Sequence, residues 1–112
     1  MKKIFLSLIL VSFVTITSFA AGHITKAQKD NAIECLGHYT ATAVLPADTV
    51  EVKDIEIALA ASKVIREYLN KEGIKNDEIN KGMNVYVDKV YGKPFNKNKN
   101  SECNKSTYDL IP

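Results

Sequence analysis

Residues 55–69 read IEIALAASKVIREYL and hold the strongest helical pattern in the chain. Their apolar side chains recur at steps of three and four but occupy more than one side of a helix. We therefore expect a helix that is contacted from at least two sides and forms the hub of the core. The other interpretation is a short strand, in which apolar residues alternate with polar ones except at residues 53 and 54. The apolar residues of this pattern are Val50, Val52, Ile55 and Ile57.

Both ends of this helix carry capping signals. Upstream, Asp48 and Glu51 form a capping signature, in which the Asp48 side chain accepts from the first turn and Glu51 lies near the positive helix end. Downstream, Gly73 can adopt the left-handed conformation that ends a helix, and Ile74 can then contact Leu69 as in a Schellman turn. These signals predict a helix that ends at residue 72.

An earlier helix is predicted at about residues 26–45. Thr25 and Gln28 have the spacing of a capping box, and Pro46 marks the end. One apolar stripe follows from steps of three and four residues: Ala32, Ile33, Leu36, Thr40, Ala43 and Val44.

A later helix is predicted to begin at Asn76, with acidic residues behind it, and to finish at Gly92 and Pro94. A short strand at residues 85–87 is the alternative. The residues expected to point inward are Ile79, Met83, Tyr86, Val87 and Val90.

Two glycines fall inside the predicted helices. Gly37 lies one turn before Ala41, and this pair of small residues would let a neighbouring backbone come close. The alternative is that Gly37 is merely tolerated. Gly82 weakens its helix by about 1 kcal/mol relative to alanine.

These elements predict an all-α fold, a small three-helix bundle that runs up, down and up with short connections. A fourth short helix or a turn at residues 108–111 would make it a four-helix bundle. The tail from about residue 93 is polar, with asparagines interleaved with lysines, and would wander unless something held it. Cys103 is expected to hold it against the first helix.

Residues 1–20 have the pattern of a secretory signal peptide. Lys2 and Lys3 supply a positive start, an apolar segment follows, and small residues around Ala20 suit a signal peptidase. An uncleaved anchor is the alternative, because the apolar segment approaches the lower limit for spanning a bilayer. We expect cleavage after Ala20. Residues 21–112 then form a single helical domain, periplasmic or secreted, with membrane contact only through the segment before cleavage.

The chain has two cysteines, Cys35 and Cys103, and both follow the predicted cleavage site. In an oxidising compartment, a single disulfide between them is the simplest pairing. The competing interpretation takes Cys35 and His38, one helical turn apart, as a thiolate and base pair or as half of a metal site. No further nearby ligand completes a metal shell, so we expect no metal site.

The charges exclude some function classes. The chain has 15 basic and 13 acidic residues, and loss of Lys2 and Lys3 with the signal peptide would leave it neutral. This balance argues against a nucleic-acid binder and against a cationic membrane-active peptide. Motifs of zinc hydrolysis, serine acyl transfer and phosphate binding are missing from the sequence. His23 lies beside the cleavage site, and His38 is interpreted as a polar position at a helix edge. We expect no catalytic residues, no cofactor and no enzymatic activity.

Two charged clusters and two tyrosines are candidates for contact with a partner. The acidic cluster comprises Asp48, Glu51, Asp54 and Glu56, and the basic one Lys93, Lys97, Lys99 and Lys105. Opposite charge on a neutral body would steer a charged partner, although both clusters also fit surfaces that only keep the protein soluble. Tyr39 and Tyr91 are expected on an exposed contact surface, whereas Tyr68 and Tyr86 fit the spacing of a core.

These observations favour an exported protein that acts by binding another protein, as an inhibitor or an immunity-type periplasmic factor does. Type VI secretion immunity proteins include exported helical domains of this size with a disulfide, which is an analogy only. The alternatives are a periplasmic stress chaperone or envelope structural factor, and a carrier with an apolar pocket between its helices.

Overall fold

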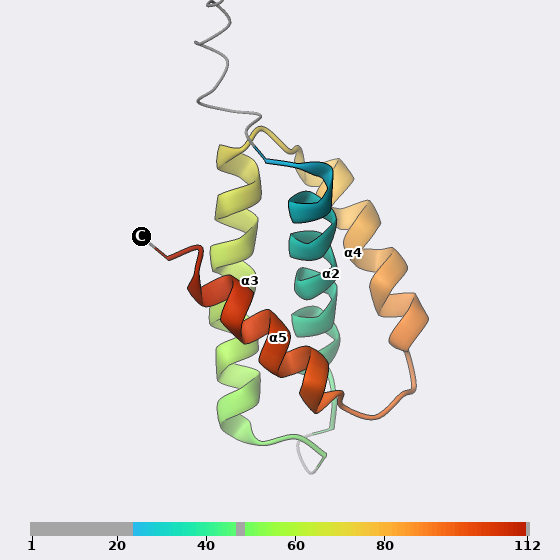
Figure 1. Ribbon diagram of the computed structural model, residues 1–112. Coiled ribbons are helices and arrows are strands. Elements are labelled where there is room, and N and C mark those ends of the chain that lie inside the picture. The colour runs from blue at the N-terminus through green and yellow to red at the C-terminus, as the bar shows by residue number, and fades with distance from the viewer. Residues whose placement is uncertain (1–23, 47–48, 112) are drawn as a thin grey trace, which may run out of the picture.

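The computed structural model describes residues 24–46 and 49–111, which form four α-helices. The helices are α2 (Lys26–Ala43), α3 (Val52–Lys71), α4 (Asn76–Val90) and α5 (Lys97–Tyr108). Consecutive helices α2, α3 and α4 are antiparallel, and α5 crosses them obliquely (Figure 1). The predicted all-α bundle is confirmed. The described segments contain no strand, so both strand interpretations are wrong.

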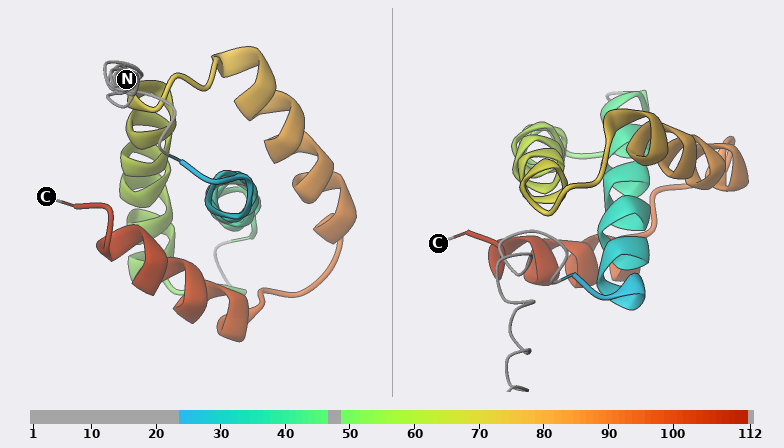
Figure 2. Two further views of the ribbon diagram at one scale, coloured as in Figure 1. Left: turned by 45° about the horizontal axis from the view of Figure 1, so that its top comes forward. Right: turned by 90° about the horizontal axis from the view of Figure 1, so that it is seen from above.

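Helix α2 is the hub of the core. It contacts each of the other three helices, which surround it when it is viewed along its axis (Figure 2, left). Its buried residues lie on every side: Ala32, Ile33, Cys35, Leu36, Gly37, His38, Tyr39 and Thr42. The expectation that α3 is the hub is wrong. Only one side of α3 is buried, and three of its large apolar residues, Val52, Ile57 and Leu59, are exposed.

Glycines bring α2 and α4 close together. A Cβ added at Gly37 would lie 2.8 Å from Tyr86 Cβ and 3.1 Å from the Met83 carbonyl oxygen. A Cβ added at Gly82 would lie 2.6 Å from Ile33 Cγ2. Both distances to side-chain carbons are shorter than real Cβ contacts, so each helix uses a glycine to admit a residue of the other. The close approach predicted for Gly37 is confirmed.

The helix caps follow the sequence signals in part. Thr25 and Gln28 form the predicted capping box. Gly73 has φ 87°, and Ile74 N–H donates to the Leu69 carbonyl at 2.9 Å, as expected for a Schellman turn after α3.

The two predicted N-terminal caps of α3 and α4 are not those of the structure. The N-cap of α3 is Glu51, which makes no side-chain cap hydrogen bond, so this helix begins later than the Asp48 signature implied. Asp48 lies outside the described residues. The N-cap of α4 is Lys75, and Asn76 is already helical, with its Oδ1 accepting from Asn70 Nδ2 at 3.1 Å.

The polar tail forms a helix, and the disulfide attaches it to α2. Asn96 caps α5 by accepting from Lys99 N at 2.9 Å. Cys35 and Cys103 are bonded, with Cα atoms 5.5 Å apart, and both are buried. The expected disulfide is confirmed, and it holds the tail against α2 as expected; the helical structure of the tail was not predicted. The possible fourth helix lies at Lys97–Tyr108 and not at residues 108–111.

The signal-peptide prediction concerns residues 1–20, and His23 follows them. Both lie in the segment 1–23, outside the described residues. Within the described part of the chain, no helix is both long and apolar enough to cross a bilayer.

Candidate functional site at the loop end

Only one of the two tyrosines expected at a contact surface is exposed. Tyr91 follows the last residue of α4 and leaves 85% of its surface in solvent. Tyr39 is fully buried in α2, and its hydroxyl donates to Asn104 Oδ1 at 2.6 Å. Burial raises the pKa of Tyr39. The expectation that Tyr39 lies on an exposed contact surface is therefore wrong, because α5 covers the ring and accepts its hydrogen bond.

His38 is inside the protein as well. Its Nε2 donates to the side-chain oxygen of Asn100 at 2.8 Å, and the Phe95 ring lies 5.9 Å away between centroids. Burial lowers the pKa of His38; the Asn100 hydrogen bond opposes this shift, and the charge of Lys99 adds to it. The interpretation of His38 as a helix-edge residue is wrong. Because Cys35 is in the disulfide, it offers no thiolate for a pair with His38.

An apolar groove opens where α2 and α4 end. It has a volume of about 310 Å³, and residues that line it include Val44, Tyr86, Val90, Tyr91 and Phe95. Val44 leaves 77% of its surface in solvent. The chain leaves α2 and α4 at this same end of the bundle (Figure 1). The groove is therefore bordered by connecting segments, which tolerate change and often carry binding residues.

A charged pocket of about 300 Å³ adjoins the groove, because Phe95 lines both. Glu51 and Asp54 from the start of α3 and Lys97 from the start of α5 line this second pocket. Two members of the acidic cluster and one of the basic cluster, which are far apart in the sequence, thus come together at one end of the molecule. We call this region the loop-end surface, defined as Val44, Glu51, Asp54, Tyr91, Phe95 and Lys97.

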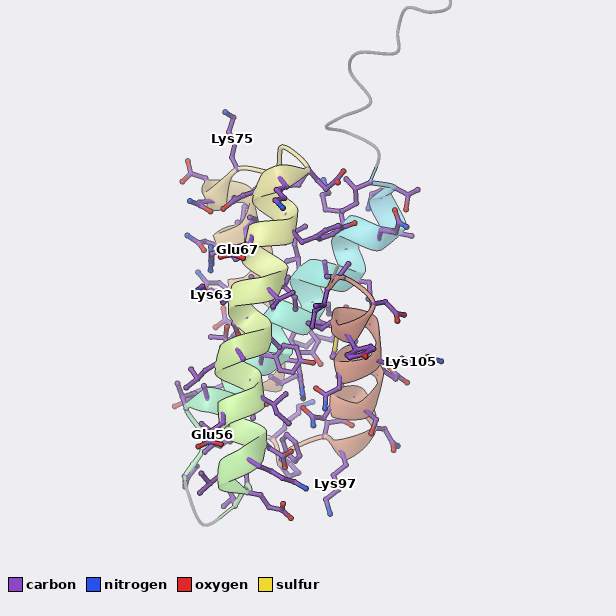
Figure 3. All side chains as sticks on the ribbon, turned by 90° about the vertical axis from the view of Figure 1, so that its left-hand side faces the viewer. Glu56, Lys63, Glu67, Lys75, Lys97 and Lys105 are labelled. Carbon is purple, nitrogen blue, oxygen red and sulfur yellow. A yellow bond between two sulfur atoms is a disulfide. The ribbon has the colours of Figure 1, made fainter. Side chains whose placement is uncertain are left out.

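Lys93 lines the apolar groove, whereas three other charged candidates lie away from both pockets. Glu56 is exposed on α3, two residues after Asp54, and does not line either pocket. Lys99 pairs with Glu34 of α2 and so helps to hold α5 in place. Lys105 is exposed in the last turn of α5, close to its end (Figure 3).

Sequence reasoning missed two residues of the loop-end surface. Val44 was assigned to the apolar stripe of the first helix, but this helix ends at Ala43 and leaves the valine at the rim. Phe95 was overlooked in a polar segment. A single aromatic residue directly after Pro94 is the signal that would have identified it, since such a residue seldom lies in a polar segment without a contact.

The composition of the loop-end surface is suited to contact with another molecule. Among residues 24–46 and 49–111, no three histidine, cysteine, aspartate or glutamate side chains come together to hold a metal ion. An exposed tyrosine and valine beside an apolar groove, with charges of both signs around them, have the composition of a protein-binding surface. Comparison with known family models, with curated proteins and with solved structures found no match for this chain.

Proposed function

We propose that this chain is an exported protein that binds another protein through its loop-end surface, as an inhibitor or immunity-type factor of the periplasm. The observation that carries the proposal is the exposure of Tyr91 and Val44 beside an apolar groove. A tyrosine on the surface combines a large apolar area with a hydroxyl, and tyrosines are enriched among residues that dominate binding.

The charges around the groove support a protein partner over an apolar small molecule. Glu51, Asp54 and Lys97 are placed where they would flank a bound surface, and charges at such a rim set orientation and association rate. The disulfide supports the exported location, because such bonds persist in oxidising compartments.

An apolar-ligand carrier is the second candidate. The groove volume of about 310 Å³ is near the lower limit for a small-molecule site. Mass spectrometry of the protein purified from its producing cell, before and after denaturation, would reveal a released molecule if the groove carried one.

Site-specific photo-crosslinking tests the proposal. A photoreactive phenylalanine analogue replaces Tyr91 in one variant and Val85 in a control, which is also an exposed apolar position of this chain but lies on the side of α4 away from the groove. In the producing cell we expect a crosslinked heterologous protein from position 91 and not from position 85. The same heterologous product from both positions, or from neither, would contradict the proposal.

A protection assay separates the immunity type from other binding. Cells that lack the gene are grown beside the parent strain and complemented with wild type, the double variant Val44→Ser and Tyr91→Ala, or Val85→Ser. We expect the wild type and Val85→Ser to restore growth and the double variant to fail. Full growth of the uncomplemented cells beside the parent would refute the immunity type.

A further inference from the structure

A second apolar surface lies between α3 and α5, away from the loop end. A groove of about 300 Å³ is lined there by Ile57, Ala60 and Val64 of α3 and by Tyr108 and Ile111. Tyr108 leaves 74% of its surface in solvent, and Ile111 and Ile57 are also exposed. Single exposed apolar residues are ordinary, but a group contributed by two elements and lining one groove indicates a binding surface.

The α3 side of this groove has the spacing of a helix-pairing seam. Lys53, Ile57, Ala60, Val64 and Glu67 follow one another at steps of four, three, four and three residues, which is the repeat that packs one helix against another. The buried side of α3 uses other positions, so the seam is not consumed by the core. Ala60 lies at its centre, where a small side chain allows a close approach.

The charges along α3 identify the occupant. Read forward, the charged residues that border the apolar centre are Lys53, Glu56, Lys63 and Glu67, with signs plus, minus, plus and minus. Read backward, the signs are reversed, so the segment is complementary to an antiparallel copy of itself. A parallel copy would place like charges together.

The orientation of these side chains agrees with this arrangement. Figure 3 looks at the side where α3 and α5 lie next to each other, and it shows Glu56, Lys63 and Glu67 along the edge of α3 that faces away from α5. None of these three makes an ion pair with another described residue. They remain available to flank a helix placed over the seam.

We propose that two copies of this chain associate through the groove, with their α3 helices antiparallel and crossing at Ala60. Lys53 of one copy then faces Glu67 of the second copy, and Glu56 lies beside Lys63 of the second copy. Tyr108 and Ile111 cover the helix of the second copy from the side. The two loop-end surfaces lie at opposite ends of this pair and stay free.

A charge exchange at the ends of the seam tests the pairing. Glu67→Lys puts a lysine opposite Lys53 of the second copy, and Lys53→Glu puts a glutamate opposite Glu67. Each substitution also suits the helix dipole, so the fold of the single chain is preserved. By analytical ultracentrifugation of the disulfide-bonded protein over a concentration series, we expect each variant to self-associate about tenfold more weakly than wild type. An equimolar mixture of the two variants should recover the wild-type affinity, because opposite charges then face each other.

An apolar substitution with a matched control checks the centre of the seam. Ile57→Ser should weaken the association, whereas Leu59→Ser should not, since Leu59 is exposed on the same helix but lies off the seam. A wild-type protein that stays monomeric at every concentration would overturn the proposal. A dimer that tolerates Ile57→Ser and both charge reversals would overturn it as well, because its interface would then lie elsewhere.

Discussion

Adding one methyl group at either glycine of the α2–α4 contact should destabilise the protein, although alanine is the better helix former. At Gly37 the new Cβ would meet Tyr86 Cβ at 2.8 Å and the Met83 carbonyl oxygen at 3.1 Å. These atoms belong to or adjoin the backbone of α4, so the two helices must separate. Such overpacking costs about 1–3 kcal/mol, and the gain in helix propensity offsets about 1 kcal/mol. We expect Gly37→Ala to lower the free energy of unfolding by up to about 2 kcal/mol.

Gly82 differs, because its obstacle is a side chain that can be removed. The new Cβ would lie 2.6 Å from Ile33 Cγ2. Ile33→Ala deletes this methyl group and leaves a cavity, which alone costs about 2–5 kcal/mol. In the Ile33→Ala background, Gly82→Ala should therefore stabilise by about 1 kcal/mol, the opposite sign to its effect in wild type. Removing the Tyr86 ring gives no such reversal for Gly37→Ala, because the Cβ of residue 86 remains.

Urea unfolding followed by circular dichroism measures these effects in a double-mutant cycle, with the disulfide intact in every variant. The reasoning would be refuted if Gly82→Ala stabilised the wild-type protein. It would also be refuted if the effects of Gly82→Ala and Ile33→Ala were additive, since the two residues would then not be in contact in the way the structure indicates.

Three further predictions concern the disulfide, the buried histidine and the end of α3. Replacing both Cys35 and Cys103 by alanine opens a loop with a sequence separation of 68 residues, and urea unfolding should show a loss of about 4 kcal/mol. A loss of less than about 1 kcal/mol in the free energy of unfolding would contradict the idea that the disulfide stabilises the protein by restricting the unfolded chain. Burial lowers the pKa of His38, so the unfolded chain takes up a proton at a pH where the folded protein does not. The stability that the neutral buried histidine allows is therefore fully present above about pH 6.5 and is lost as the pH falls through the folded pKa. The fall in the urea midpoint between about pH 7 and pH 5 should shrink in His38→Gln, and an unchanged slope would contradict this. Gly73→Ala should cost about 1 kcal/mol because φ is 87° there, and thermal unfolding at a Tm equal to wild type would count against it.

The sequence predicted the helices that are built by apolar periodicity and capping, but not the arrangement around α2. Residues 55–69 are apolar on several sides, and this pattern normally indicates a central helix. The structure instead centres on α2, whose buried set includes His38, Tyr39 and Thr42. Hydropathy alone does not identify such a helix as central, because its polar groups become compatible with burial only when their hydrogen bonds are accepted inside the protein.

Helix α5 accepts the hydrogen bonds of His38 and Tyr39, whereas Thr42 Oγ1 donates to the His38 carbonyl within α2. Helix α5 itself was not predicted as a helix, because its sequence is polar. Its buried residues are Asn100, Cys103 and Thr107, and Asn104 accepts from Tyr39. These four positions are spaced by three, one and three residues, which is a helical repeat made mostly of polar side chains. A search for apolar repeats passes over it. The cysteine was the one residue of the set that sequence reasoning used, and it placed the segment against α2 correctly.

The loop-end surface could be predicted only in its parts. Residue type alone made Tyr91, Glu51 and Asp54 candidates, because a sequence shows which side chains are aromatic or charged. Their proximity to Phe95 and Lys97 depends on α5 beginning at the end of the bundle where α3 begins, and this helix had not been predicted. Val44 was missed because α2 ends at Ala43, two residues before the predicted end.

The central position of α2 also restricts where this protein can meet a partner. Because α3, α4 and α5 surround α2, most side chains from Ala32 to Thr42 are engaged inside the bundle, and what is left for a partner is the ends of the bundle, including the exposed first turns of α2, and the outer sides of the other helices (Figure 2). The loop-end surface is one such end, and the α3–α5 groove is one such side. An antiparallel pair that uses the groove would present two loop ends facing apart. Substitutions at the groove should then abolish pairing without abolishing the contact made by Tyr91, so the two surfaces can be separated experimentally.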